Sequence, residues 1–134
     1  MAQVINTGFR ALVDAAMAEV ETIGAEDAVA LASSEDVVLV DIRDIRELAR
    51  EGKVPGAVHA PRGMLEFWID PESPYHRDVF AQDKRFVFFC AGGLRSALAT
   101  QTAQRMGLRP VCHIKGGFGA WRDAGGDVET VQAK

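Results

Sequence analysis

Residues 86–96 read Phe86-Val87-Phe88-Phe89-Cys90-Ala91-Gly92-Gly93-Leu94-Arg95-Ser96, and they give the clearest indication of the fold class. Its first four residues are apolar without polar alternation, which is typical of a strand covered on both faces of a parallel sheet. The glycine pair then interrupts regular structure, and small and apolar residues between Arg95 and Met106 predict a helix packed close to that sheet. A buried strand that leads through a short loop into a helix is the repeating unit of an α/β protein.

Segments on either side repeat this order of strand and helix. Residues 37–40 form a second run of the buried-strand type, and shorter strands are expected at 22–23, 57–60 and 111–114. Further helices are expected at 8–20, 26–32, 45–50, 64–69 and 116–121. Asp44 is a suitable N-cap for the helix at 45–50, and Gly107 a suitable end for the helix that starts at Arg95. The class is therefore α/β with a mainly parallel sheet.

The chain of 134 residues has the length of a single domain. We divide it into an N-terminal helical extension (1–23), a core (24–126) and a C-terminal tail (127–134). The extension carries an apolar stripe at helical spacing, formed by Phe9, Leu12, Val13, Ala16 and Val20. No apolar run approaches the ~18 residues of a membrane span, and the first residues do not resemble a secretion signal. With only 2 cysteines, a disulfide framework is not expected, and we predict a reduced, cytoplasmic setting.

The charge balance indicates the kind of partner. A net charge of −4 argues against nucleic acid, and no membrane partner is expected. All the basic residues but Arg10 follow Asp41, so the back two-thirds of the chain is slightly cationic and suits a small anionic substrate. The simpler interpretation, which we favour, is that the acidic residues before position 42 form a solvated face on the first helices.

The loop after the strand at 86–89 is the candidate site. Sites in α/β sheets form beyond the carboxyl ends of strands, where a loop entering a helix directs backbone N–H groups into one space. Gly92 and Gly93 allow positive φ and keep that space open, and Arg95 adds a positive charge. These features favour the thiolate of Cys90, which is the nucleophilic form. The alternative is that Cys90 is one more small buried apolar residue.

Four segments, in order, resemble the motifs of the rhodanese family. They are Cys90-x-x-Gly93-x-Arg95-Ser96, Val38-Leu39-Val40-Asp41-Ile42-Arg43 with Glu47, Gly52-Lys53-Val54-Pro55-Gly56-Ala57-Val58-His59-Ala60-Pro61, and Gly116-Gly117-Phe118-x-Ala120-Trp121. The third has Lys53 where the family usually has histidine. The resemblance implies a rhodanese-like fold, a five-stranded mainly parallel sheet with helices on both faces, to which the N-terminal helix is added.

The resemblance also implies residue roles. Cys90 would be the catalytic nucleophile that carries sulfur as a persulfide, with Arg95 as its catalytic partner and no cofactor or metal. The binding residues would be the rest of the loop and the neighbouring strand end: Ala91, Gly92, Gly93, Leu94, Ser96, Asp41 and Arg43. Asp41 and Arg43 would brace the loop through a charge-assisted pair, whereas Gly117 and Trp121 would only pack.

Loop length separates two chemistries that share this fold. Four residues lie between Cys90 and Arg95, whereas cysteine phosphatases place five there, so the shorter ring suits one sulfur atom better than a phosphate. The sequence thus predicts a sulfurtransferase that moves sulfane sulfur from thiosulfate or a persulfide to cyanide, a small thiol or a protein acceptor. Since Arg95 is the only basic residue in the loop, thiosulfate is expected to be a poor donor. Two alternatives stay open: a persulfide carrier or redox-sensing domain without turnover, and a small cysteine phosphatase or arsenate reductase.

Other reactive residue types are assigned structural positions. Cys112 is expected to be a buried core thiol, and His59 and His113 to be structural residues in strands, with His76 in a loop. Their spacing does not fit a zinc site. The segment 62–76 is either a lid, with Arg62, Phe67 or Trp68 beside the cysteine, or a hydrophobic cover for the sheet. The sequence leaves the oligomeric state open.

Overall fold

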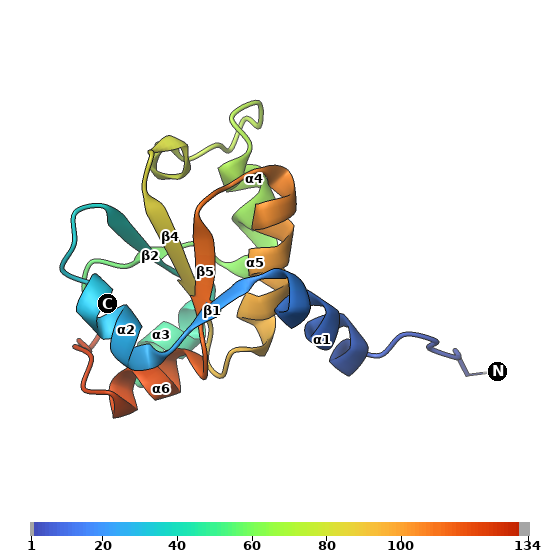
Figure 1. Ribbon diagram of the computed structural model, residues 1–134, viewed down its shortest axis with the longest axis horizontal. Helices are drawn as coiled ribbons and strands as arrows, with labels where there is room; N and C mark the ends of the chain where they lie inside the picture. Colours follow the sequence, from blue (N-terminus) through green and yellow to red (C-terminus); the bar gives the residue numbers. More distant parts are fainter. Residues whose placement is uncertain (1, 132–134) are drawn as a thin grey trace.

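The computed structural model describes residues 2–131 and has one parallel sheet between two layers of helices (Figure 1). The strands lie in the order β1-β5-β4-β2-β3 and all their pairings are parallel. The strands are β1 (Glu21–Ile23), β2 (Val37–Asp41), β3 (Val58–His59), β4 (Arg85–Phe89) and β5 (Val111–Ile114). The helices are α1 (Phe9–Glu19), α2 (Ala25–Leu31), α3 (Ile45–Glu51), α4 (Leu65–Ile69), α5 (Leu94–Met106) and α6 (Gly117–Asp123), with 3-10 turns η1 (Arg62–Met64) and η2 (Asp78–Ala81). The predicted α/β class and five-stranded sheet are confirmed.

Strand alternation divides the core into two clusters. Phe86, Phe88 and Cys90 point to the face that α4 and α5 cover, where Ala99 and Ala103 let α5 approach closely. Val87 and Phe89 point to the opposite face, which is packed by α2 and α6 (Figure 1). Both faces of β4 are therefore buried, as its unbroken apolar run predicts.

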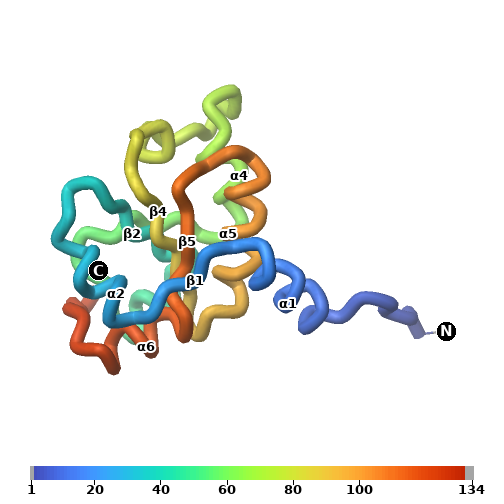
Figure 2. Tube along the Cα trace, viewed as in Figure 1, coloured from blue at the N-terminus to red at the C-terminus, as the bar shows by residue number. Residues whose placement is uncertain are grey.

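The N-terminal helix α1 lies against α5 and leads into β1, the edge strand of the sheet. The strand expected at Thr22 and Ile23 is confirmed, and it places the last residues of the extension inside the sheet. Of the expected apolar stripe, Val13, Ala16 and Val20 are buried, but Phe9 and Leu12 are 60% and 49% exposed. Residues 2–8, before α1, extend away from the domain (Figure 2).

The C-terminal tail packs on the end of α3. Lys53 and Glu129 form an antiparallel bridge with N···O distances of 2.9 and 2.8 Å, and an ion pair of 3.4 Å joins their side chains. Residues 132–134 of the predicted tail lie outside the described residues. Between residues 2 and 131, no helix combines the length and apolar character needed to cross a membrane.

The segment 62–76 covers one edge of the sheet. Leu65 and Ile69 are buried in the core, and Trp68 packs beside them with the Arg77 guanidinium 4.1 Å from its ring. Phe67 and Tyr75 are exposed and meet edge to face at 6.5 Å. These contacts fit the hydrophobic cover, and the lid stays a hypothesis. The turn η2, which follows this segment, has no periodic signal in the sequence and was not predicted.

The turn from β2 into α3 is built on a buried ion pair. The Arg43 guanidinium donates to Asp41 Oδ2 at 2.8 Å and to the Gly52 carbonyl at 2.9 Å, and it lies 4.0 Å from the centre of the Phe118 ring. Both charged side chains are almost fully buried, at 0% and 2% exposure. Arg43 therefore joins the end of β2, the end of α3 and the start of α6. The charge-assisted pair expected between Asp41 and Arg43 is present.

Replacement of Arg43 is expected to show how much this pair supports the fold. Arg43→Met leaves the Asp41 carboxylate buried without a counter-ion, and we expect a loss of about 3–5 kcal/mol in the free energy of unfolding, measured by urea denaturation. The double variant Asp41→Leu/Arg43→Met removes both charges and should recover part of that loss. Equal losses for the single and double variants would contradict this account.

Candidate active site

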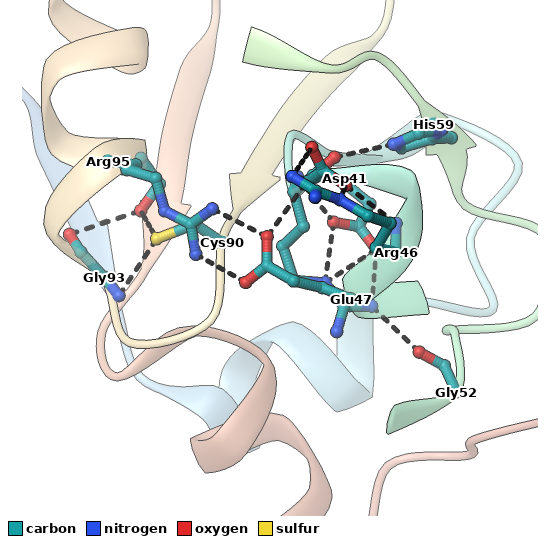
Figure 3. Close-up of polar contacts among 11 residues, drawn as sticks. Asp41, Arg46, Glu47, Gly52, His59, Cys90, Gly93 and Arg95 are labelled. Atoms are coloured by element: carbon teal, nitrogen blue, oxygen red, sulfur yellow. Dashed lines mark hydrogen bonds and ion pairs between the residues drawn. The ribbon is translucent and has the colours of Figure 1, made fainter. Parts of the chain in front are cut away.

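The sulfur of Cys90 lies at the end of β4, directly before the N-terminus of α5. Its side chain is buried, and the Gly93 backbone N–H donates to Sγ at 3.1 Å (Figure 3). Because α5 has 13 residues, its N-terminus adds the positive end of a helix dipole to this N–H group. The position is one in which negative charge on sulfur is stabilised.

Glycines set the shape of the loop. Gly93 has φ of 102°, and a Cβ there would lie 3.2 Å from the Gly116 nitrogen. Gly92 does not adopt the positive φ expected at this position, and a Cβ there would meet open space. Gly117, expected only to pack, has φ of 60°, and a Cβ there would collide with the Cys90 carbonyl oxygen. Only glycine at 117 therefore allows this approach of α6 to the loop.

Two backbone hydrogen bonds join the start of α6 to the cysteine loop. The Phe118 N–H donates to the Cys90 carbonyl at 2.7 Å, and the Gly119 N–H donates to the Ala91 carbonyl at 3.3 Å. Since Phe118 also stacks on Arg43, the loop is tied to the buried ion pair of β2. Asp41 and Arg43 thus support the loop, and neither exposes a surface that a substrate could contact.

Arg95 does not turn its guanidinium toward the sulfur. It forms a bidentate pair with Glu47 of α3, with N···O distances of 2.8 and 2.9 Å (Figure 3). This hydrogen bonding lowers the pKa of Glu47 to about 2 and raises the pKa of Arg95, so the pair is ionised at neutral pH. Glu47 also accepts the Asp44 N–H at 2.9 Å in the capping box of α3. The only basic side chain of the loop therefore already has an anionic partner.

A polar network that the sequence did not indicate lies beneath the sulfur. Cys90 Sγ is 3.6 Å from Ser96 Oγ, and Ser96 Oγ is 2.8 Å from His113 Nδ1. On the other side of the ring, His113 Nε2 is 3.0 Å from Thr22 Oγ1. His113 is 1% exposed and lies on the α5 face of β5, because it shares that face with Val111. The one sequence signal for this network was a histidine, His113, within an apolar strand, because a buried imidazole needs hydrogen-bond partners.

The remaining reactive residues lie elsewhere. Cys112 is a buried thiol, as predicted, and burial raises its pKa. His59 Nε2 contacts the Arg43 carbonyl at 2.7 Å, and His76 lies 3.7 Å from Asp78. Within residues 2–131, His, Cys, Asp and Glu side chains form no group of three that could hold a metal ion. The loop rim is formed by Gly92, Leu94 and Arg95, which are exposed, with Ala91 half-buried beside them.

Comparison with known proteins identifies the family of this chain. The rhodanese-like domain family matches residues 24–124, and the chain belongs to this family. It is 30% identical over 111 residues to human thiosulfate:glutathione sulfurtransferase, covering 78% of this chain and 96% of that protein. It is also 30% identical over 96 residues to the mouse thiosulfate sulfurtransferase/rhodanese-like domain-containing protein 3, covering 68% of this chain but only 61% of that protein.

Solved structures resemble both the core and the N-terminal extension. A protein of unknown function from Rhodopseudomonas palustris, described as a possible tyrosine phosphatase, is 60% identical with a TM-score of 0.93, covering 96% of this chain and 99% of that one. The polysulfide-sulfur transferase homodimer of Wolinella succinogenes is 30% identical with a TM-score of 0.70, covering 92% of this chain and 88% of that one. The suspected rhodanese-like resemblance is confirmed.

The two loop glycines give a matched pair of variants. Gly93→Ala forces a side chain into positive φ against the Gly116 nitrogen and should destabilise the protein by about 1–2 kcal/mol. It should also slow alkylation of Cys90 by iodoacetamide at neutral pH, because the N–H donor at Sγ is displaced. Gly92→Ala, with open space at its Cβ, should change neither quantity. Similar losses in both variants would show that the Gly93 conformation is not what matters.

Proposed function

We propose that the protein is a sulfurtransferase in which Cys90 carries one sulfur atom as a persulfide. The observation that carries this proposal is the Gly93 N–H at 3.1 Å from Sγ, at the start of α5 in a loop with only four residues before Arg95. A thiolate and a terminal persulfide both carry one negative charge, so the same donors suit both. No cofactor is needed, because the transferred group stays covalently bound to the protein.

The transfer consists of two displacements. The Cys90 thiolate attacks the outer sulfur of a donor; with thiosulfate, the S–S bond breaks and sulfite leaves with the bonding pair. An acceptor then attacks the outer sulfur of the persulfide, and Cys90 leaves as thiolate. With cyanide the product is thiocyanate, and with a thiol it is a new persulfide that keeps the proton of the thiol. Each step conserves charge, and neither requires an oxidant.

The surroundings of the loop favour some donors over others. Because Arg95 is paired with Glu47 and Ala91 is apolar, the side chains of the loop itself offer little free positive charge to the thiosulfate dianion. A small or protein-bound persulfide is therefore the preferred donor. The polysulfide-sulfur transferase fits this assignment by its name, whereas the name of thiosulfate:glutathione sulfurtransferase gives thiosulfate as the donor and supports only the small-thiol acceptor. The reduced cytoplasmic setting stays part of the proposal, because sulfur exchange between thiols requires free thiols.

Intact mass measurement tests the reaction. After incubation with cysteine persulfide, the protein should gain the mass of one sulfur atom, and Cys90→Ser should gain none. Added cyanide should remove the gain and release thiocyanate over repeated cycles. A stable gain without repeated release would indicate the carrier alternative instead of an enzyme.

The phosphatase alternative is tested in parallel, since a structure 60% identical to this chain is described as a possible tyrosine phosphatase. Hydrolysis of an aryl phosphate that depends on Cys90, together with no sulfur gain from either donor, would overturn the proposal. The loop length leads us to expect the opposite result.

Release of Arg95 should improve thiosulfate as a donor. Glu47→Gln keeps an acceptor for the capping box but removes the charge that holds the guanidinium. We expect sulfur loading from thiosulfate to become about tenfold faster relative to loading from cysteine persulfide, since a charge-assisted hydrogen bond becomes available to the dianion. Glu51→Gln removes the same charge from the exposed end of α3 and serves as the control. If both variants change the ratio equally, the pair does not determine donor choice.

A further inference from the structure

A continuous series of polar contacts joins the buried sulfur to β1, an edge strand of the sheet. They begin at Cys90 Sγ, continue through Ser96 Oγ at 3.6 Å, and reach His113 Nδ1 after a further 2.8 Å. From His113 Nε2 they continue to Thr22 Oγ1 at 3.0 Å, and the Thr22 hydroxyl donates to Met17 Sδ at 3.8 Å. Cys90 follows β4, and the other residues come from α5, β5, β1 and α1, so these contacts cross the domain from the sulfur to its edge.

The middle of this series of polar contacts is buried away from solvent. Ser96 and His113 are 0% and 1% exposed, whereas Thr22 is partly exposed on β1. Although His113 lines a cavity, both of its ring nitrogens are occupied, Nδ1 by Ser96 and Nε2 by Thr22, so protons are exchanged through the groups they contact. Those groups are the thiol at one end and Thr22 at the other, with the Gly93 carbonyl as a longer contact of Ser96 at 3.3 Å.

The surroundings keep His113 neutral. Burial lowers its pKa, and Arg10 and Lys115 line a cavity of about 250 Å³ that His113 shares with the cysteine loop. Asp14 is the acidic group of that lining, so the cations outnumber the acid there. The strand partners Thr22 on β1 and Phe88 on β4 do not titrate. A neutral imidazole has one N–H donor and one acceptor nitrogen, as a proton relay requires.

We propose that Cys90 loses its proton through Ser96, His113 and Thr22, and that the tautomer of His113 sets the charge on the sulfur. The S–H bond breaks, and its electron pair stays on sulfur while the proton passes to Ser96 Oγ. The former Ser96 proton moves to His113 Nδ1, the Nε2 proton moves to Thr22 Oγ1, and the Thr22 proton leaves to bulk water. No buried residue other than Cys90 changes its charge.

The relay reverses every hydrogen bond along its length. With a thiol, Cys90 donates to Ser96, Ser96 donates to Nδ1, and Nε2–H donates to Thr22. With a thiolate, Nδ1–H donates to Ser96, and the Ser96 hydroxyl turns to donate to sulfur beside the Gly93 N–H. The inference rests on the proposed function, because it concerns ionisation of the same nucleophile.

Nitrogen NMR of the protein labelled with ¹⁵N-histidine tests the coupling. The chain has 3 histidines, and the His113 signals are assigned by their loss in His113→Asn. The tautomer of His113 should change from Nε2–H to Nδ1–H with the same pH midpoint as alkylation of Cys90 by iodoacetamide. In Cys90→Ala it should not change in that range. A fixed tautomer in the wild type, or conversion of His113 to imidazolium at the midpoint, would overturn the proposal.

A double-mutant cycle separates the relay from simple packing. Thr22→Val preserves the side-chain shape but leaves Nε2–H without an acceptor, which favours the Nδ1–H tautomer. The alkylation midpoint should therefore fall by about one pH unit, a tenfold gain in thiolate below the midpoint. In a Ser96→Ala background the same substitution should have no effect. Equal shifts in both backgrounds, or none in either, would overturn the relay.

These experiments distinguish failure of the relay hypothesis from failure of the proposed sulfur transfer. A coupled tautomer in a protein that gains no sulfur supports the relay and contradicts sulfur transfer. A fixed tautomer in a protein that loads sulfur contradicts the relay alone.

Discussion

The position of the Cys90 sulfur depends on one buried guanidinium. Arg43 is held by Asp41 and by the Gly52 carbonyl, and its flat face supports the Phe118 ring. The backbone of Phe118 then fixes the Cys90 carbonyl at 2.7 Å. Because an unpaired charge in this place would be strongly unfavourable, all these contacts must form together. The ion pair thus orients the turn after β2 and, through α6, the loop after β4.

The loop separates the donors that face the sulfur from the charge that faces solvent. The N–H of Gly93 is fixed by a backbone conformation that only glycine adopts easily, so its direction does not depend on a flexible side chain. Arg95 is the second residue of α5, and Glu47 holds its guanidinium toward α3. The sulfur therefore accepts from a backbone N–H, and the positive charge of Arg95 is balanced by Glu47. Under the proposed function, such a setting suits a singly charged atom more than a dianion.

The sequence predicts what local patterns encode. The apolar runs of β2 and β4 identify the buried strands, Gly107 ends α5 as predicted, and the capping role of Asp44 is present. Contacts between distant elements are not encoded in this way. Glu47 and Arg95 are 48 residues apart, and nothing local to either residue indicates that they pair. His113 shows only that a polar ring is buried in a strand, and its partners are defined by the strand order and the packing of α5. The exposure of Phe9 and Leu12 likewise depends on which face of α1 the rest of the domain covers.

A cysteine that must be both thiol and thiolate needs partners that can reverse. A backbone N–H only donates, so Gly93 stabilises the thiolate but offers nothing to the S–H proton. The Ser96 hydroxyl both accepts and donates, and His113 does the same by changing tautomer. In the proposed cycle, each transfer step begins and ends with one negative charge on the cysteine, so a thiol acceptor would remove sulfur without using the relay. The proposed role of the network is therefore on entry to the cycle, when the resting thiol is converted to the nucleophile, and that of the fixed N–H groups is during transfer.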